Sequence, residues 1–219
     1  MAVNLKYQQR AQRKTMITVA EWFGASHDVY TLQTSQPSDW TTNYDAYYVK
    51  VGDEYQAVTG DEAPVWAANT YYTKTTTTQY REVLGVRTEE SSIEYNPDVQ
   101  KVTDVLGTTW TDVEKTEPQQ TFDPFYVLGG SELADYLATA AMKNDIDAYN
   151  NTFAVYVITA FLGTEGAYKA VKHQHCTILP NSLGGDSYVS MPIELHLSND
   201  IVEGTVDKLG DDFEFTPVS

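Results

Sequence analysis

The chain has 219 residues, a length that suits one sizeable domain or one domain with a small inserted module. It carries 31 acidic against 14 basic side chains, a net charge of -17. Duplex DNA carries about one negative charge per 1.7 Å of its axis, so ordinary nucleic-acid binding is not expected. The single cysteine, Cys176, excludes an internal disulfide and a zinc site built on cysteines.

No segment of the sequence predicts a membrane span or a signal peptide. No apolar run approaches the roughly 18 residues that a membrane helix needs. The basic residues near the start are not followed by an apolar segment. We therefore expect synthesis in the cytosol and no membrane partner.

The composition is typical of a mainly β protein. Tyrosine occurs 16 times, and threonine and valine are also abundant. Apolar runs bounded by turn residues predict about nine strands, and only one helical stripe accompanies them. We predict a β-sandwich or barrel with one packed helix.

Residues 1–15 are polar and contain four of the 14 basic side chains, Lys6, Arg10, Arg13 and Lys14. We interpret them as an N-terminal arm, with a disordered terminus as the alternative. Residues 16–23 and 28–32 each predict a strand, joined by a turn at residues 24–26.

Residues 37–79 form a predicted small β module, set between core segments 16–36 and 80–219. Residues 49–51 and 55–58 flank a Gly-Asp turn and predict a hairpin. The aromatic residues of the module predict either a mini-core or an exposed surface for a sugar or a partner protein. The residues of that alternative surface are Trp40, Tyr48, Trp66 and Tyr72.

The clearest helix signal follows Ser131, a predicted N-cap. An apolar stripe with helical spacing comes next, and Asn144 is a predicted end of the helix. The stripe consists of Leu133, Tyr136, Leu137, Ala140 and Ala141. One apolar face must lie on another element, and we expect that element to be a sheet.

The remaining predicted strands surround this helix in the chain. Residues 83–88 and 91–95 precede it. Residues 153–162, nearly all apolar, predict a strand buried on both faces. Further strands are predicted at 171–179, at 188–197 with alternating burial, at 201–206 and at 213–215.

We find no catalytic constellation and expect neither enzymatic activity nor a cofactor. His173-x-His175-Cys176 is the best metal candidate, because the two imidazoles would share one face of a strand. A third ligand cannot be placed, and we favour a structural role. Cys176 lies within an apolar run, which indicates an inert buried thiol.

Several segments resemble major tail (tail tube) proteins of bacteriophages that infect Gram-positive bacteria. They fall within about residues 80–219 and comprise residues 88–98, 117–125, 180–186, 191–197 and 204–207. The resemblance implies hexameric rings that stack into a virion tail tube around an inner β-barrel shared between subunits, with the helix outside. DNA would pass through the lumen without sequence-specific binding. Other tail proteins, such as a tape measure protein, would be partners.

Under this resemblance the acidic residues acquire a role. Glu90 and Glu94 would share one strand face and line the lumen, while Ile93 and Tyr95 point to the core. Glu194, with His196, is a second candidate. The alternative is that these acids are merely solvated outside.

The basic residues of the arm would dock on an acidic neighbouring ring. Two other virion roles, a tail terminator and a capsid decoration protein, remain alternatives. A carbohydrate-binding module at residues 37–79 is an alternative from another class.

Overall fold

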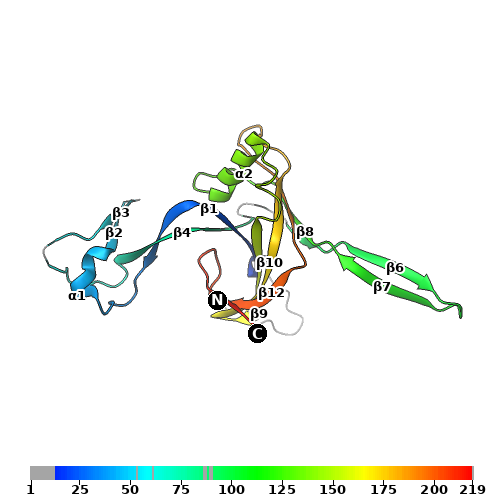
Figure 1. The fold of residues 1–219 in the computed structure, drawn as a ribbon, viewed down its shortest axis with the longest axis horizontal. Helices are drawn as coiled ribbons and strands as arrows, with labels where there is room; N and C mark the ends of the chain where they lie inside the picture. The colour runs from blue at the N-terminus through cyan, green and yellow to red at the C-terminus, as the bar shows by residue number, and fades with distance from the viewer. Residues whose placement is uncertain (1–12, 53, 61, 86–87, 89–90, 219) are drawn as a thin grey trace. The chain divides into compact units, whose positions relative to one another are not determined.

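The computed structural model describes residues 13–52, 54–60, 62–85, 88 and 91–218 (Figure 1). The described chain is mainly antiparallel β structure, as the sequence predicts. It divides into two compact units, one of Met1–Phe23 with Tyr80–Ser219 and one of Gly24–Gln79. We call them unit 1 and unit 2 and describe each by itself.

Two strands run through both units: β1 (Met16–Leu32) and β4 (Tyr71–Val83). Unit 2 also contains α1 (Trp40–Asn43), the 3-10 turn η2 (Tyr44–Ala46), β2 (Tyr47–Val51) and β3 (Glu54–Ala57). Unit 1 begins with the 3-10 turn η1 (Arg13–Thr15) and otherwise contains β5 (Ile93–Glu94), β6 (Pro97–Thr103), β7 (Thr109–Thr116), β8 (Gln119–Phe122), α2 (Glu132–Lys143), β9 (Phe153–Thr164), β10 (Ala167–Pro180), β11 (Ile193–His196), β12 (Ile201–Val206) and β13 (Phe215–Pro217).

The long strand β10 organises unit 1. Along one edge it pairs with β9, which in turn pairs with β1. Its other edge is shared: residues before a bulge between His173 and Cys176 pair with β12, and residues after it pair with β11. Beyond β11 the sheet continues to β8 and β5, and beyond β12 to β13. The sheet runs from β3 to β5, with β13 at the end of a branch, so the barrel anticipated from the sequence is not closed within the described part of one chain.

The strands before and after the bulge face one another across a shared core. Thr18 of β1 donates a buried hydrogen bond of 3.0 Å from Oγ1 to Oε1 of Gln120 on β8. Both residues are buried, and apolar side chains from β1, β8, β9, β10 and β11 pack around them. This layering positions the outer face of β5, β8 and β11 described below.

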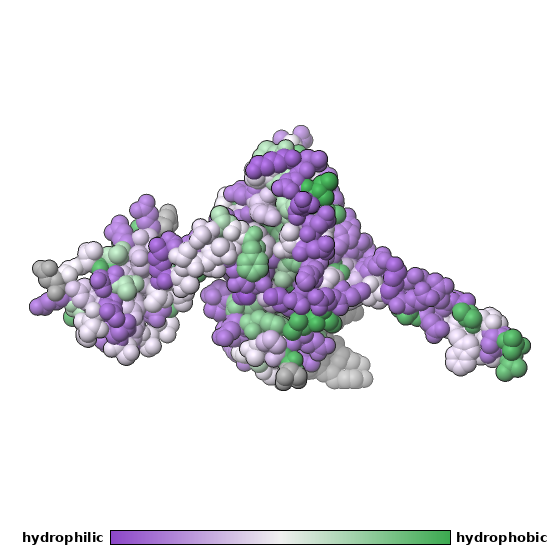
Figure 2. Space-filling model, in the orientation of Figure 1, coloured by the Kyte–Doolittle hydropathy of each residue, from purple (hydrophilic) through white to green (hydrophobic). Residues whose placement is uncertain are grey.

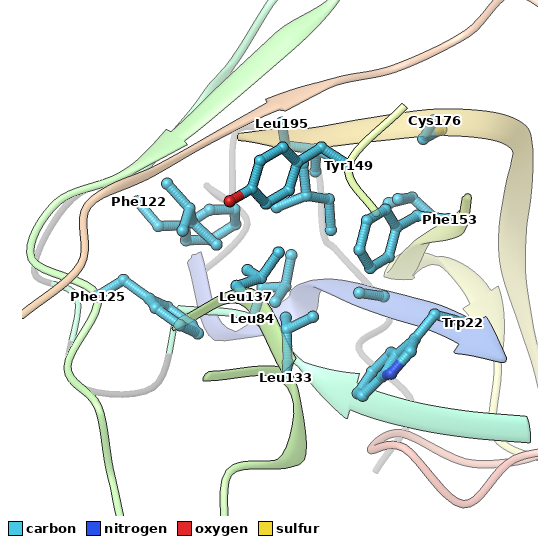
Figure 3. Packing of buried hydrophobic residues seen from close by; sticks show 14 of the residues in the cluster. Trp22, Leu84, Phe122, Phe125, Leu133, Leu137, Tyr149, Phe153, Cys176 and Leu195 are labelled. Atoms are coloured by element: carbon cyan, nitrogen blue, oxygen red, sulfur yellow. The ribbon is translucent and has the colours of Figure 1, made fainter. Parts of the chain in front are cut away.

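Helix α2 covers this core, and its bounds confirm the predicted helix. Ser131 caps it, since Oγ accepts a hydrogen bond of 3.1 Å from the amide of Ala134. Asn144 ends it in the left-handed conformation. Leu133 and Leu137 are fully buried, and Figure 3 shows them among side chains from the strands. The labelled neighbours in that view include Trp22, Leu84, Phe122 and Phe153.

A buried charge network on the opposite face of β1 and β9 joins β1, β4, β9, β10 and the segment before β13. The Glu21 carboxylate accepts hydrogen bonds from Arg81 Nε at 2.7 Å, Lys172 Nζ at 3.0 Å and Tyr156 Oη at 3.0 Å. Arg81 also donates to the carbonyl of Phe213 at 2.8 Å. Burial favours a higher pKa for Glu21, but the hydrogen bonds from Lys172 and Arg81 outweigh it and lower that pKa below its ordinary value.

The structure corrects the predicted turn at residues 24–26. Strand β1 continues through this segment to Leu32 because β4 pairs beside it. An ion pair of 2.7 Å between Lys74 and Asp28 connects the two strands within unit 2. Unit 2 consequently begins at Gly24, whereas the sequence placed the start of the module at residue 37.

Three other predicted strands are shorter than expected. Gly85, at φ +84°, turns the chain away just after β4 ends at Val83. Strand β5 contains only Ile93 and Glu94. Around Tyr188, which is exposed, reciprocal backbone hydrogen bonds between Gly184 and Ser190 fold the chain into a loop. The alternating burial therefore extends from Met191 to Leu197 and does not include Val189.

Candidate functional site

Two acidic residues that the sequence suggested separately, Glu94 and Glu194, lie on one face of unit 1. Glu94 of β5 is opposite Gln119 of β8, which is opposite His196 of β11. On the next pair of that face, Thr121 of β8 is opposite Glu194 of β11. We call this set, Glu94, Gln119, Thr121, Glu194 and His196, the polar face.

The polar face is solvent-accessible and carries no lysine or arginine among its five residues. His196 Nε2 lies 3.3 Å from Glu194 Oε1, and the two side chains are 44% and 32% exposed. Beside them is a polar hollow of about 310 Å³, lined by Ser91, Ser92, Glu94, Gln119, Thr121 and Asp123. Of the predicted lumen acids, Glu90 lies outside the described residues.

The neighbours of Glu94 only partly follow the prediction. Ile93 packs against the main core, as expected. Tyr95 is 62% exposed, so the prediction that it points to the core is wrong. The reason is local: β5 ends at Glu94, and Asn96, at φ +42°, turns the chain toward β6.

The β6–β7 hairpin presents a second unusual surface. Its register puts Val99 opposite Val113, and Val102 opposite Trp110. Since these pairs are three residues apart, they lie on opposite faces of the hairpin. All four side chains are exposed, Trp110 to 59%. The hairpin therefore presents apolar pairs to solvent on both faces.

The tip of this hairpin has a defined turn structure. The Asp104 carboxylate accepts hydrogen bonds from the amides of Leu106 and Thr108 at 2.9 Å each, and from the Trp110 indole at 3.3 Å. These bonds, above all the one from Thr108, hold the pKa of Asp104 below its ordinary value. Val105 and Leu106 are almost fully exposed on this turn, and Figure 2 shows apolar surface at the hairpin's end.

The predicted aromatic surface is divided between two faces of unit 2. Trp40 is 2% exposed and packs in a core with Tyr47, Tyr71 and the partly buried Trp66. This arrangement supports the mini-core interpretation for the tryptophans. The Trp40 indole is also anchored by a hydrogen bond, since its Nε1 donates to the carbonyl of Pro64 at 2.9 Å.

Tyr48 and Tyr72 lie on the opposite face of the same sheet, where they are directly opposed across β2 and β4. There they meet Tyr30 and Tyr55, which the sequence did not single out. The Tyr30 and Tyr55 rings are stacked at 3.9 Å between centroids. Tyr48 meets Tyr30 edge-on at 5.1 Å, and Tyr72 meets Tyr55 edge-on at 4.9 Å. We call these four residues the tyrosine face.

The His-x-His-Cys segment does not have the regular strand geometry that the sequence argument assumed. The bulge in β10 puts His175 at φ +56°, so it does not share a regular strand face with His173. His173 Nδ1 lies 2.8 Å from the carbonyl oxygen of Ser198. Across the described residues, no three His, Cys, Asp or Glu side chains are placed to hold an ion together.

Cys176 is fully buried, as predicted, and burial raises the pKa of its thiol to about 11. Such a thiol is almost entirely protonated at neutral pH. Of the basic arm, Lys6 and Arg10 lie outside the described residues. Arg13 and Lys14 belong to η1, where Lys14 is exposed.

Within the described part of the chain, no helix has the length and apolar character that crossing a bilayer requires. Comparisons of this chain with models of known families, with curated proteins and with solved structures give no match. Its function must therefore be inferred from its own surfaces.

Proposed function

We propose that this protein is a structural virion subunit, a tail tube protein without enzymatic activity, that assembles with copies of itself into hexameric rings that stack into a tube. The observation that carries the proposal is the β6–β7 hairpin, whose two faces both present apolar pairs to solvent. A two-stranded hairpin of this kind is marginal in water unless another surface covers it. A neighbouring copy on each side would bury both faces.

The edges of the unit 1 sheet support the same conclusion. Two ends of the sheet, β5 and β13, lie in unit 1, and both of these strands are short. Sheet edges present unpaired backbone donors and acceptors that favour pairing with another chain. Pairing between copies would close in a ring the barrel that one chain leaves open.

The polar face suits the wall of a DNA channel. Its two carboxylates repel a polyanion, and it offers no lysine or arginine to hold one. Screening limits that repulsion to about 8 Å at physiological salt, so residues on the lumen surface would dominate. DNA would thus pass during ejection without being bound.

Electron microscopy of the purified full chain tests the assembly. We expect tubes of stacked rings for the native protein and single rings or monomers for Val102→Thr combined with Trp110→Thr. Met142→Thr, at an exposed apolar position of α2 away from the hairpin, is the control and should form tubes. A protein that stays monomeric at high concentration and in the virion contradicts the proposal. Isolated rings of the native protein would favour a tail terminator instead. Binding of the native protein to capsids would favour a decoration protein.

A second experiment tests the lumen. Phage carrying Glu94→Lys and Glu194→Lys should assemble tails of normal length but release DNA more slowly, because two attractive sites per subunit replace repulsive ones. Asp147→Lys, at an exposed position in the loop after α2, is the control. Unchanged release from tubes containing both lysines would refute the lumen assignment while leaving self-assembly intact.

The N-terminal arm completes the proposed tube. Basic residues 6–14 would dock on the acidic surface of the next ring. Deleting residues 1–12 should then shorten the tubes, as measured by electron microscopy. Tubes of native length would refute a role for the arm in stacking. Partners at the tube's ends or interior would be other tail proteins, such as a tape measure protein.

A further inference from the structure

The tyrosine hydroxyls on the two faces of the unit 2 sheet differ in their hydrogen bonding. On the Trp40 side, the hydroxyl of Tyr47 bonds Asp39 at 2.8 Å and that of Tyr71 bonds the Val65 carbonyl at 3.4 Å. On the tyrosine face, the hydroxyls of Tyr30, Tyr48, Tyr55 and Tyr72 have no hydrogen-bond partner in the described part of the chain. All four side chains are only half-buried. The tyrosine face therefore presents four phenolic hydroxyls to the surroundings.

The charges of unit 2 are also segregated. Its sequence contains two basic residues, Lys50 and Lys74. Lys50 is opposite Tyr55 in the β2–β3 register, with Nζ 5.6 Å from the centre of that ring. Lys74 has Nζ 5.9 Å from the centre of the Tyr48 ring. Both cations of the unit thus lie on the tyrosine face of a strongly acidic chain.

Among the described acidic residues of unit 2, none forms an ion pair with the second of these cations, Lys50. Asp28 pairs with Lys74 at 2.7 Å and also accepts a bond from Thr76. Lys50 forms no ion pair with any described residue. Glu54, at the end of the hairpin, is opposite Val51 and so lies on the other face.

From these observations we propose that the tyrosine face is a binding site for an acidic polysaccharide. The phenolic hydroxyls would exchange hydrogen bonds with sugar hydroxyls, and Lys50 would pair with a sugar carboxylate. The Tyr30 and Tyr55 rings are already stacked on each other, and Lys50 lies over Tyr55. Recognition therefore depends on hydroxyl and ammonium groups, not on flat stacking of a sugar ring.

This site is independent of the proposed tube. Every residue of the tyrosine face and both lysines belong to unit 2, whose own core is the Trp40 cluster. Tyrosine-to-phenylalanine changes keep the stacked rings and remove only the hydroxyls. We expect such variants to fold and self-assemble as the native protein does, so that failure here and failure of the tube are distinguishable.

The test is electrophoresis of the purified full chain through gels containing polygalacturonate or neutral dextran. We expect polygalacturonate to retard the native protein, dextran not to, and added salt to weaken the retardation. The combined Tyr30→Phe, Tyr48→Phe, Tyr55→Phe and Tyr72→Phe variant should bind at least tenfold more weakly. Tyr95→Phe with Tyr188→Phe, two exposed tyrosines of unit 1, is the hydroxyl control.

The lysines form a second, separate arm of the experiment. Lys50→Gln should weaken binding to polygalacturonate several-fold, and Lys101→Gln, an exposed lysine of the hairpin, should not. Equal retardation by dextran, an unchanged affinity in the four-tyrosine variant, or no retardation by polygalacturonate would each overturn the proposal. Loss of self-association in the four-tyrosine variant would instead assign the face to contacts between copies and overturn it as well.

Discussion

The core beneath α2 and the β6–β7 hairpin use the same kinds of residue with opposite outcomes. In the core, apolar side chains from five strands and one helix cover one another completely (Figure 3). In the hairpin, apolar pairs lie on both faces and remain exposed. The difference separates what the chain stabilises by itself from what it leaves for another molecule. Substitutions should therefore affect unfolding in the first region and association in the second.

The largest expected effect is a truncation in the core. Phe153→Ala removes a 1% exposed ring that packs against Trp22 and Tyr136. It should lower the free energy of unfolding by about 4 kcal/mol, measured by chemical denaturation. Val105→Ala, at a fully exposed position of the hairpin tip, should change it by less than about 0.5 kcal/mol. Similar losses of unfolding free energy in the two variants would contradict the proposed difference between the core and the hairpin.

The Glu21 network should come next. Glu21→Leu leaves Arg81 and Lys172, each 23% exposed, without their shared acceptor. We expect a loss of about 3 kcal/mol, near the lower end for breaking a buried pair because both cations retain some solvent. Asp212→Asn, in the exposed pair with Lys208, is the control and should cost less than about 0.5 kcal/mol. Equal unfolding midpoints for the two variants would contradict the network's role.

The same carboxylate predicts a smaller, pH-dependent effect. Folding lowers the pKa of Glu21, so the ionised carboxylate stabilises the folded state. This stabilisation is fully present at pH values above the ordinary pKa of 4.5, and it is lost as the pH falls through the lower pKa of the folded state. The difference in the free energy of unfolding between the native protein and Glu21→Gln should therefore become smaller from pH 7 toward pH 3. Asp28, Asp39 and Asp104 also have lowered pKa values but are present in both proteins. If the difference in the free energy of unfolding became larger in acid, this prediction would be contradicted.

The smallest effect on unfolding is expected in the hairpin. Val99→Thr with Val113→Thr should change the free energy of unfolding by less than about 0.5 kcal/mol, because both side chains are already exposed. The same double variant should prevent tube formation, since it alters the face opposite Val102 and Trp110. Normal tubes would mean that only one face of the hairpin is covered in the assembly.

Local sequence signals were sufficient for several elements. Ser131, the apolar stripe and Asn144 predict α2 because capping and helical periodicity act within a few residues. The apolar run around Cys176 predicts its burial for a similar reason. The β2–β3 hairpin follows from its Gly-Asp turn.

Features that depend on pairing between distant strands could not be read in this way. Glu21 meets Lys172 across 151 positions of the chain, and no local pattern indicates that contact. Tyr30 joins the tyrosine face through the register of separate strands. The convergence of Glu94 and Glu194 likewise required β8 between them. In the hairpin, the Asp104–Gly107 turn was the available signal, but nothing local shows that both faces stay uncovered.

The passage of β1 and β4 through both units has a practical consequence. The chain leaves unit 1 after Phe23 and returns at Tyr80, on strands that are neighbours in the sheet. Trp22 and Tyr80 stack at 5.4 Å beside this exit and entry point. A foreign domain whose own ends lie close together could be spliced in at the same place. If the subunit polymerises, every copy would then display that cargo at a regular spacing.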